Sequence, residues 1–268
     1  MSSFLHISDL HISCGLMDTR NENNFPSVHL QTAINIANQL EPKPKFIIFS
    51  GDLTDTGDLA SYEYLKSVVS VSKVPIILAL GNHDNRSNFK KVFYGNESDD
   101  PYFHASEYDE FKIIVLDTNK PSKVSGTICE DQFGFLRDVL KKRTNHKVLL
   151  VLHHPPSIDE DDLPWTTLDK ESSLELYSCL KGHEISGIFC GHIHLNKFIH
   201  WNNIPIITSS GLQSTIDPLE NTELRLLESA SLNLCKINKG GLNITSLHMH
   251  PVGREIRRVN KNILRSKV

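Results

Sequence analysis

The chain has 268 residues, of which 39% are hydrophobic and 22% are charged, and its formal net charge is −4 at pH 7. This composition is ordinary for a globular protein, and the negative balance excludes a general attraction to nucleic acid polymers or anionic membranes. No stretch approaches the roughly 18 apolar residues of a membrane span, and residues 1–8 do not resemble a signal peptide. The scattered cysteines favour reduced thiols in a cytoplasmic protein. They are Cys14, Cys129, Cys179, Cys190 and Cys235.

Short apolar runs alternate with helical patterns along the chain. The runs predict strands at 4–8, 46–50, 75–80, 111–117, 147–154, 187–192 and 204–210. Because they are almost continuously hydrophobic, we expect both faces of the sheets to be covered. Apolar periodicity predicts helices at 27–40, 58–72, 130–142 and 170–181. Residues 85–104 and 155–170 are interpreted as loops. This order predicts an α/β fold whose functional residues gather at the carboxyl ends of strands.

Five polar clusters each follow a predicted strand. They are Asp9 and His11 in "DLH", Asp52 and Asp55 in "GDLTD", Asn82, His83 and Asp84 in "GNHD", His153 and His154 in "HHPP", and His192 and His194 in "GHIH". The i, i+2 pairs predict two side chains on one face of an extended segment. Adjacent glycines allow sharp turns and close backbone approach.

Donors of the Asp, Asn and His types, without cysteine, favour Mn, Fe(II) or Zn. They are too many for one tetrahedral ion, whereas two ions that share a carboxylate use them all and suit attack on phosphorus.

In this order, the five clusters resemble the signature of the calcineurin-like metallophosphoesterases, and the short forms "LHHPP" and "CGHIH" resemble the bacterial class III cyclic-nucleotide phosphodiesterase and glycerophosphodiesterase group. The segment "SGTICEDQFGFLRDVL" is similar to that group as well. The resemblance covers residues 9–194. It implies a four-layer α/β/β/α sandwich with two mixed β-sheets and a dinuclear metal site at the strand C-terminal edge. We expect one domain over 1–268, with all site motifs in 1–197 and a strand-rich part, 198–268, that completes the second sheet.

The resemblance also implies a role for each motif residue. One ion is expected on Asp9, His11, Asp52 and His194, and the other on Asp52, Asn82, His153 and His192. His153 is favoured over His154 because the family's ligand lies two residues before the proline. His83 is expected to donate a proton to the leaving oxygen, with Asp55 orienting it. Asn82, His83 and His194 are expected to contact substrate.

The function implied is hydrolysis of a small phosphodiester by a metal-bound hydroxide, with a 3′,5′-cyclic nucleotide such as cAMP favoured and a glycerophosphodiester next. A phosphomonoesterase or nuclease of the same superfamily is the alternative, and a non-catalytic scaffold is the alternative of another class. We expect no nucleic acid polymer and no membrane as partner, and the subgroup suggests a homodimer.

Several polar residues near the motifs have simpler interpretations. Asp58 is predicted to cap a helix, and Asp84 either caps a helix that begins near Asn85 or lies in the ligand shell. The tail at 253–268 is interpreted as a solvated end, with subunit contact as the alternative.

Overall fold

The computed structural model describes residues 2–14, 26–142, 145–220, 222–249 and 255–260. In chain order the elements are β1 (Ser2–Ile7), α1 (Pro26–Gln39), β2 (Ile47–Ser50), α2 (Leu59–Val69), β3 (Ile76–Ala79), α3 (Arg86–Tyr94), β4 (His104–Tyr108), β5 (Phe111–Val115), α4 (Glu130–Lys141), β6 (Lys147–Val151), α5 (Lys170–Leu180), β7 (Ile185–Cys190), β8 (Lys197–Trp201), β9 (Ile204–Thr208), β10 (Ser214–Ile216), β11 (Glu223–Glu228), β12 (Ser231–Asn238), β13 (Gly241–His248) and β14 (Glu255–Asn260).

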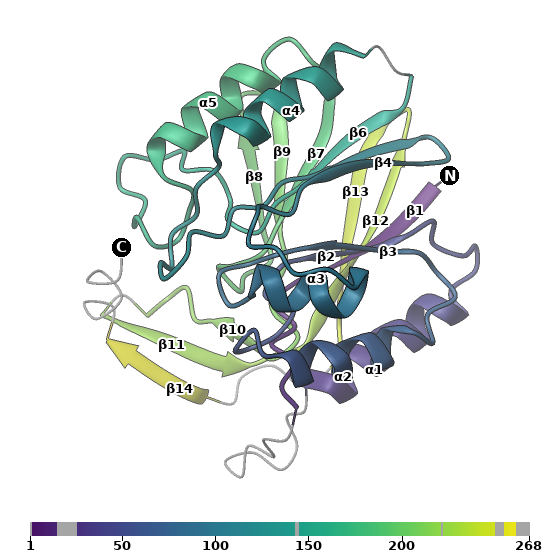
Figure 1. Cartoon of the computed structure of the whole chain (residues 1–268), viewed down its shortest axis with the longest axis vertical. Coiled ribbons are helices and arrows are strands. Elements are labelled where there is room, and N and C mark those ends of the chain that lie inside the picture. The colour runs from purple at the N-terminus through teal and green to yellow at the C-terminus, as the bar shows by residue number, and fades with distance from the viewer. Residues whose placement is uncertain (1, 15–25, 143–144, 221, 250–254, 261–268) are drawn as a thin grey trace.

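Two mixed sheets form the middle of the molecule. One has the strand order β13-β12-β1-β2-β3, and the other β4-β5-β6-β7-β9-β8. Strands β1, β2 and β3 run parallel, as do β5, β6, β7 and β9, whereas β12 and β13 join by antiparallel pairing. Helices α1 and α2 cover the first sheet and α4 and α5 the second (Figure 1). The predicted α/β/β/α sandwich is therefore confirmed.

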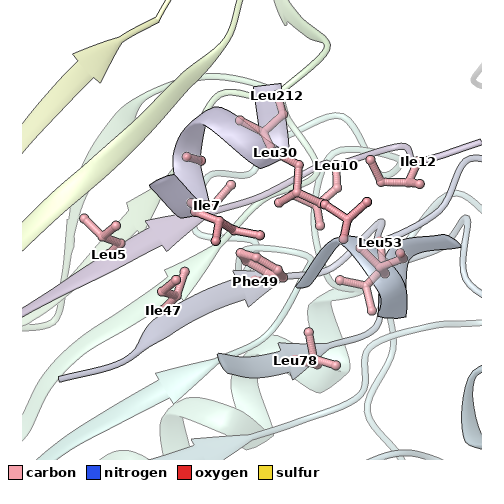
Figure 2. Packing of buried hydrophobic residues seen from close by; sticks show 14 of the residues in the cluster. Leu5, Ile7, Leu10, Ile12, Leu30, Ile47, Phe49, Leu53, Leu78 and Leu212 are labelled. Atoms are coloured by element: carbon pink, nitrogen blue, oxygen red, sulfur yellow. The ribbon is translucent and has the colours of Figure 1, made fainter. Parts of the chain in front are cut away.

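Three layers of buried apolar side chains separate these four layers of backbone. Strand β1 contributes to two of them because successive side chains point to opposite faces. Leu5 and Ile7 pack with Leu30 of α1 (Figure 2). Phe4 points between the sheets, where its ring centroid lies 4.9 Å from that of Phe46 and 5.2 Å from that of Phe189. Truncation of one such phenylalanine to alanine lowers the free energy of unfolding by about 3–5 kcal/mol. These side chains therefore hold the two sheets together.

One predicted loop contains a helix. Residues 85–104 were expected to be irregular, but α3 occupies Arg86–Tyr94. Its Phe89 is its one fully buried side chain, so the apolar periodicity is weak. Asn85 caps the helix by accepting from the main-chain nitrogen of Asn88 at 2.9 Å, and the chain leaves the helix at Gly95 with φ of 75°. The cap is thus Asn85 and not Asp84. Asp58 caps α2 as predicted, accepting from Ser61 N at 2.9 Å.

The C-terminal part does not complete a single sheet. Strands β8 and β9 extend the six-stranded sheet, β12 and β13 extend the five-stranded sheet, and β10, β11 and β14 form a third sheet. The last strand shows that residues 255–260 pair with β11 and are not a frayed end, while residues 261–268 lie outside the described part of the chain. Among the described helices, none is long and apolar enough to cross a membrane.

Candidate metal centre

The five polar clusters meet where parallel strands end. Asp9, Asp52 and Asn82 follow β1, β2 and β3, and His153 and His192 follow β6 and β7. Because parallel strands of one sheet place their carboxyl ends at the same edge, each sheet brings its own clusters together. The stacking of the sheets then joins the two groups, and His153 Nε2 lies 3.3 Å from Asp52 Oδ2. Asp9, Asp52 and His153 are each at most 2% exposed.

The backbone at these residues differs from the predicted extended form. Asp9, His11, Asp52, His192 and His194 all have positive φ, between 45° and 70°. The two members of each i, i+2 pair still reach the site, but through left-handed turns. Such a conformation costs a non-glycine residue about 1–3 kcal/mol and persists where the surroundings enforce it. A cluster of five strained residues therefore indicates a functional site.

Glycines give the carboxylates and imidazoles the room they occupy. A Cβ on Gly51, whose φ is 104°, would lie 2.5 Å from Nδ1 of His153. A Cβ on Gly81 would collide with the carboxylate of Asp52. The close approach predicted for these glycines is therefore present.

Candidate ligand atoms from segments after different strands lie at distances that allow them to bind the same ion. His11 Nε2 is 3.2 Å from His194 Nε2, and His194 Nε2 is 3.3 Å from Asp9 Oδ1. Asp52 Oδ2 lies between the two halves, 3.3 Å from His153 Nε2 and 3.7 Å from His11 Nε2. Two ligand atoms that are each about 2.1 Å from one ion are about 3 to 3.4 Å apart. The spacing therefore suits ligands of two ions that share Asp52.

Each of four imidazoles is anchored through one nitrogen and directs the other inward. Nδ1 of His11, His153 and His194 donates to Asp55 Oδ1 (3.1 Å), Ser50 O (2.8 Å) and Ser214 O (3.1 Å), respectively, and His192 Nε2 donates to Trp165 O (2.6 Å). Anchoring of this kind fixes the tautomer and orientation of metal-ligating histidines. The free nitrogens are therefore positioned to act as ligands.

Two predicted ligand atoms are buried without a hydrogen-bond partner in the described part of the chain. They are His153 Nε2 and Asn82 Oδ1. A buried polar atom left unpaired costs about 1–3 kcal/mol, and a cation removes that cost. By contrast, both nitrogens of His154 are engaged, since Nε2 donates to Val124 O at 2.9 Å and Nδ1 accepts from Thr118 Oγ1 at 2.7 Å. The geometry thus favours His153 over His154, and the residues fit two divalent ions.

The buried carboxylates of the cluster are stabilised by the imidazoles beside them. Burial alone raises the pKa of Asp52, but the imidazoles of His153 and His83 hold it well below its usual range. Burial likewise opposes ionisation of Asp9, yet His194 keeps the pKa of that carboxyl low. Both acids are therefore carboxylates, as metal ligands must be.

His83 lies at the outer side of the cluster, and its side chain is 41% exposed. Its main-chain nitrogen donates to Asp52 Oδ1 at 2.9 Å, and its Nδ1 donates to the main-chain oxygen of Asp55 at 2.7 Å. Asp55 thus contacts His83, as predicted for its orienting role, but the closest contact is the main-chain oxygen, and the role itself stays a prediction. The carboxylate of Asp55 bonds His11, and its distance to His83 Nδ1 is 3.8 Å.

Asp84 is a structural brace that sequence reasoning did not identify. Its carboxylate accepts from the main-chain nitrogens of Leu53 (3.0 Å), Thr54 (3.2 Å) and Gly81 (2.9 Å) and from Tyr62 Oη (2.9 Å). It thereby ties the turn that carries Asp52 to the turn that carries Asn82. Trp165 and Ser214 were missed as well. Trp165 contacts His192 through its main-chain oxygen, for which side-chain type gives no signal, and Ser214 contacts His194 through both its main-chain oxygen and its hydroxyl.

A sandwich of two mixed sheets whose strand ends hold carboxylates and imidazoles for two ions defines a metal-dependent phosphoesterase. The family model described as calcineurin-like phosphoesterase matches residues 2–196, and the chain belongs to this family. Membership implies two divalent metal ions and an enzyme that cleaves phosphate esters.

The comparisons with individual proteins agree with this assignment. The chain is 31% identical over 212 residues to a probable glycerophosphodiester phosphodiesterase of Arcobacter nitrofigilis, covering 77% of each protein. It is 30% identical over 219 residues to a cAMP/cGMP dual specificity phosphodiesterase of Mycobacterium tuberculosis, covering 80% of this chain and 68% of that protein. A dimetal phosphatase from Danio rerio has the same fold, with a TM-score of 0.68 at 14% identity and coverage of 97% and 98%.

Proposed function

We propose that this protein is a phosphodiesterase that hydrolyses a small phosphodiester, with a 3′,5′-cyclic nucleotide such as cAMP favoured and a glycerophosphodiester as the second candidate. The observation that carries the proposal is the gathering of the imidazoles of His11, His153 and His194 around the carboxylates of Asp9 and Asp52, with His83 exposed beside them. Relatives named as phosphodiesterases of both kinds support the choice of a diester.

We propose two ligand sets that share Asp52. Asp9, His11, Asp52 and His194 hold one ion, and Asp52, Asn82, His153 and His192 hold the other. Because the donors are carboxylate, amide and imidazole groups, Mn, Fe or Zn are the metals proposed. When bound, the two ions supply Lewis acidity to the phosphate and lower the pKa of water to make a nucleophile.

His83 is proposed to protonate the leaving oxygen. The bond from Nδ1 to Asp55 O turns Nε2 away from Asp55, and the exposed ring is accessible to a phosphate at the cluster. Burial lowers the pKa of His83, but the charge of Asp52 outweighs it, so the net shift is upward and favours the protonated form. Asn82 and His194 are proposed to help hold the phosphate oxygens.

A substrate panel tests the proposal. The protein is loaded with Mn²⁺, and product is measured for 3′,5′-cAMP, 2′,3′-cAMP, a glycerophosphodiester, bis(p-nitrophenyl) phosphate and p-nitrophenyl phosphate, before and after a chelator. We expect chelator-sensitive turnover of diesters in excess of the monoester. A folded, metal-loaded protein that prefers the monoester, or that is inactive on every ester, contradicts it.

A cytoplasmic setting is also proposed, because all five cysteines are free thiols and three of them, Cys179, Cys190 and Cys235, are buried. The homodimer suggested by the resemblance stays a prediction that sedimentation or light scattering can check.

A further inference from the structure

A cavity lies beside the metal centre without including any of its proposed ligands. Its volume is ≈ 200 Å³. Its apolar wall comes from Pro155, Pro156 and Trp165 on one loop, from Ile193 and Ile199, and from Leu224 of β11. The cavity thus joins the loop after β6, the segment after β7 and the third sheet, which are far apart in sequence.

The cavity shares structural parts with the metal centre. The main-chain oxygen of Trp165 accepts from His192 Nε2 at 2.6 Å, and Ile193 lies in the chain between His192 and His194. On the far wall, the main-chain nitrogen of Ile216 donates to the main-chain oxygen of His194 at 3.3 Å. A molecule in the cavity therefore contacts Ile193, whose neighbours in sequence, His192 and His194, are both proposed to bind metal.

One polar atom of this wall has no partner. Trp165 is 5% exposed, and its indole Nε1 is buried and unpaired among the residues that the structure describes. An indole N–H is a donor only, and a buried tryptophan usually finds an acceptor. The cavity therefore has an indole in its wall, and the N–H of that indole lies beneath the accessible surface.

Charge excludes a phosphate from the cavity itself. The charged residues that line it are Asp162, Asp217, Glu220 and Lys197, so carboxylates outnumber the single ammonium. The carboxylates already accept from the protein: Asp162 Oδ2 from Ile158 N at 2.9 Å and Asp217 Oδ2 from Arg225 at 2.9 Å. Carboxylate oxygens keep further acceptor sites, which suit an amino or hydroxyl donor.

We propose that this cavity binds a flat heteroaromatic ring that carries an amino donor, as an aminopurine base does. Ligand pockets for drug-sized molecules usually have about 300–1,000 Å³, so this smaller volume suits a base rather than a whole nucleotide. The base is either that of a diester whose phosphate lies at the metals or that of a separate nucleoside. The first source rests on the proposed function, whereas binding of a nucleoside does not.

Adenosine, which has the base but no phosphate, is the probe for binding. The chain has two tryptophans, so Trp201→Phe leaves Trp165 as the sole indole. We expect adenosine to change the fluorescence of Trp165 saturably, with or without metal, and ribose at the same concentration to leave it unchanged. A flat response to adenosine up to millimolar concentration overturns the proposal.

Filling the cavity tests its effect on turnover. We expect Leu224→Trp to lower kcat/KM for 3′,5′-cAMP about tenfold or more while changing that for glycerophosphoethanolamine less than threefold, with metal content unchanged. Leu219→Trp, on an 85% exposed neighbour outside the cavity, is the matched control. Equal losses on both substrates, or no loss on either together with an unchanged adenosine affinity by isothermal calorimetry, which the added indole does not disturb, contradict the proposal.

Inhibition kinetics distinguish the two sources of the base. Competitive inhibition by adenosine against 3′,5′-cAMP assigns the cavity to the substrate's own base. A saturable fluorescence response with a change in kcat instead assigns it to a separate nucleoside. If no diester is hydrolysed under any condition, the proposed function fails, and the fluorescence response still decides the cavity.

Discussion

Asp55 contacts His83 most closely through its main-chain oxygen, 2.7 Å from His83 Nδ1, while its carboxylate lies nearer to Nδ1 of His11, at 3.1 Å, than to Nδ1 of His83, at 3.8 Å. The side chain of Asp55 therefore serves a proposed metal ligand, and its backbone serves the proposed acid. The two functions separate on mutation, because a substitution removes the carboxylate and leaves the carbonyl in place.

We expect Asp55→Ala to weaken metal binding and leave the chemical step nearly intact. Loss of a carboxylate that orients a ligating histidine typically costs 10- to 100-fold in metal affinity or activity. The measurement is turnover as a function of Mn²⁺ concentration. Activity should recover at saturating metal, whereas His83→Ala should bind metal normally and stay at least about 100-fold slower. Persistently low turnover of Asp55→Ala at saturating metal argues against this division.

Asp52→Ala is expected to lose both ions, because Asp52 Oδ2 lies between His153 and His11. Metal content by elemental analysis after gel filtration is the measurement, and His83→Ala, with normal content, is the control. Retention of one tightly bound ion by Asp52→Ala would show that the carboxylate is not shared.

His153 and His154 are adjacent but are expected to respond differently to substitution. His154→Ala should keep the metal stoichiometry and lose about 2–4 kcal/mol of unfolding free energy, because Thr118 Oγ1 and Val124 O lose their partner and a cavity forms. His153→Ala should lose metal. Denaturant unfolding and metal analysis of both variants check this, and metal loss by His154→Ala alone would reverse the assignment.

Replacing Asp84 by Asn should destabilise the protein, although the two side chains have nearly the same shape. In Asp84→Asn, an amide NH₂ takes the place of an oxygen that accepts from main-chain nitrogens, for example those of Leu53 and Gly81. We expect a loss of about 1–3 kcal/mol, the cost of buried donors left unpaired, seen as a lower denaturant midpoint. Asp58→Asn, whose new residue is an equally good helix cap, is the control. Equal stability of wild type and Asp84→Asn would contradict the bracing role.

The metal-free protein is expected to lose stability as the pH rises from about 6.5 to 9.5. Burial lowers the pKa of His153, but Asp52 and Asp9 outweigh it and raise this pKa from 6.5 to about 9. A raised pKa contributes stability that is complete below the unfolded value and is lost as the pH passes the folded value, about 3 kcal/mol here. The melting temperature with chelator should fall over this range, and the fall should be smaller with Mn²⁺, which binds deprotonated imidazole. A chelated protein with a flat melting profile contradicts the protonated His153.

Residue type and spacing determined much of this protein in advance. Continuous apolar runs such as "FIIF" before Gly51 indicate doubly covered strands, since only a strand between two layers needs side chains without alternation. Asp, Asn and His placed after five such strands indicated the metal chemistry, because donor identity follows from side-chain type alone.

Other features depended on the tertiary structure. The short helix α3 was missed because it buries little apolar surface and is fixed by its caps at Asn85 and Gly95. The three-way division of the C-terminal strands could not be read from the sequence, because any exposed strand edge can accept them.

The sequence by itself determined which atoms are available to hold metal, because each side chain carries its donors wherever it lies. Only the tertiary structure decided which of those atoms converge. Asp55 was predicted to serve His83 with its carboxylate, yet in the fold that carboxylate lies nearer to His11, and the main-chain oxygen is the closest contact to His83. Carbonyl oxygens such as those of Asp55, Ser50 and Trp165 are present in every residue, so their roles arise from position, and position is set by packing between distant segments.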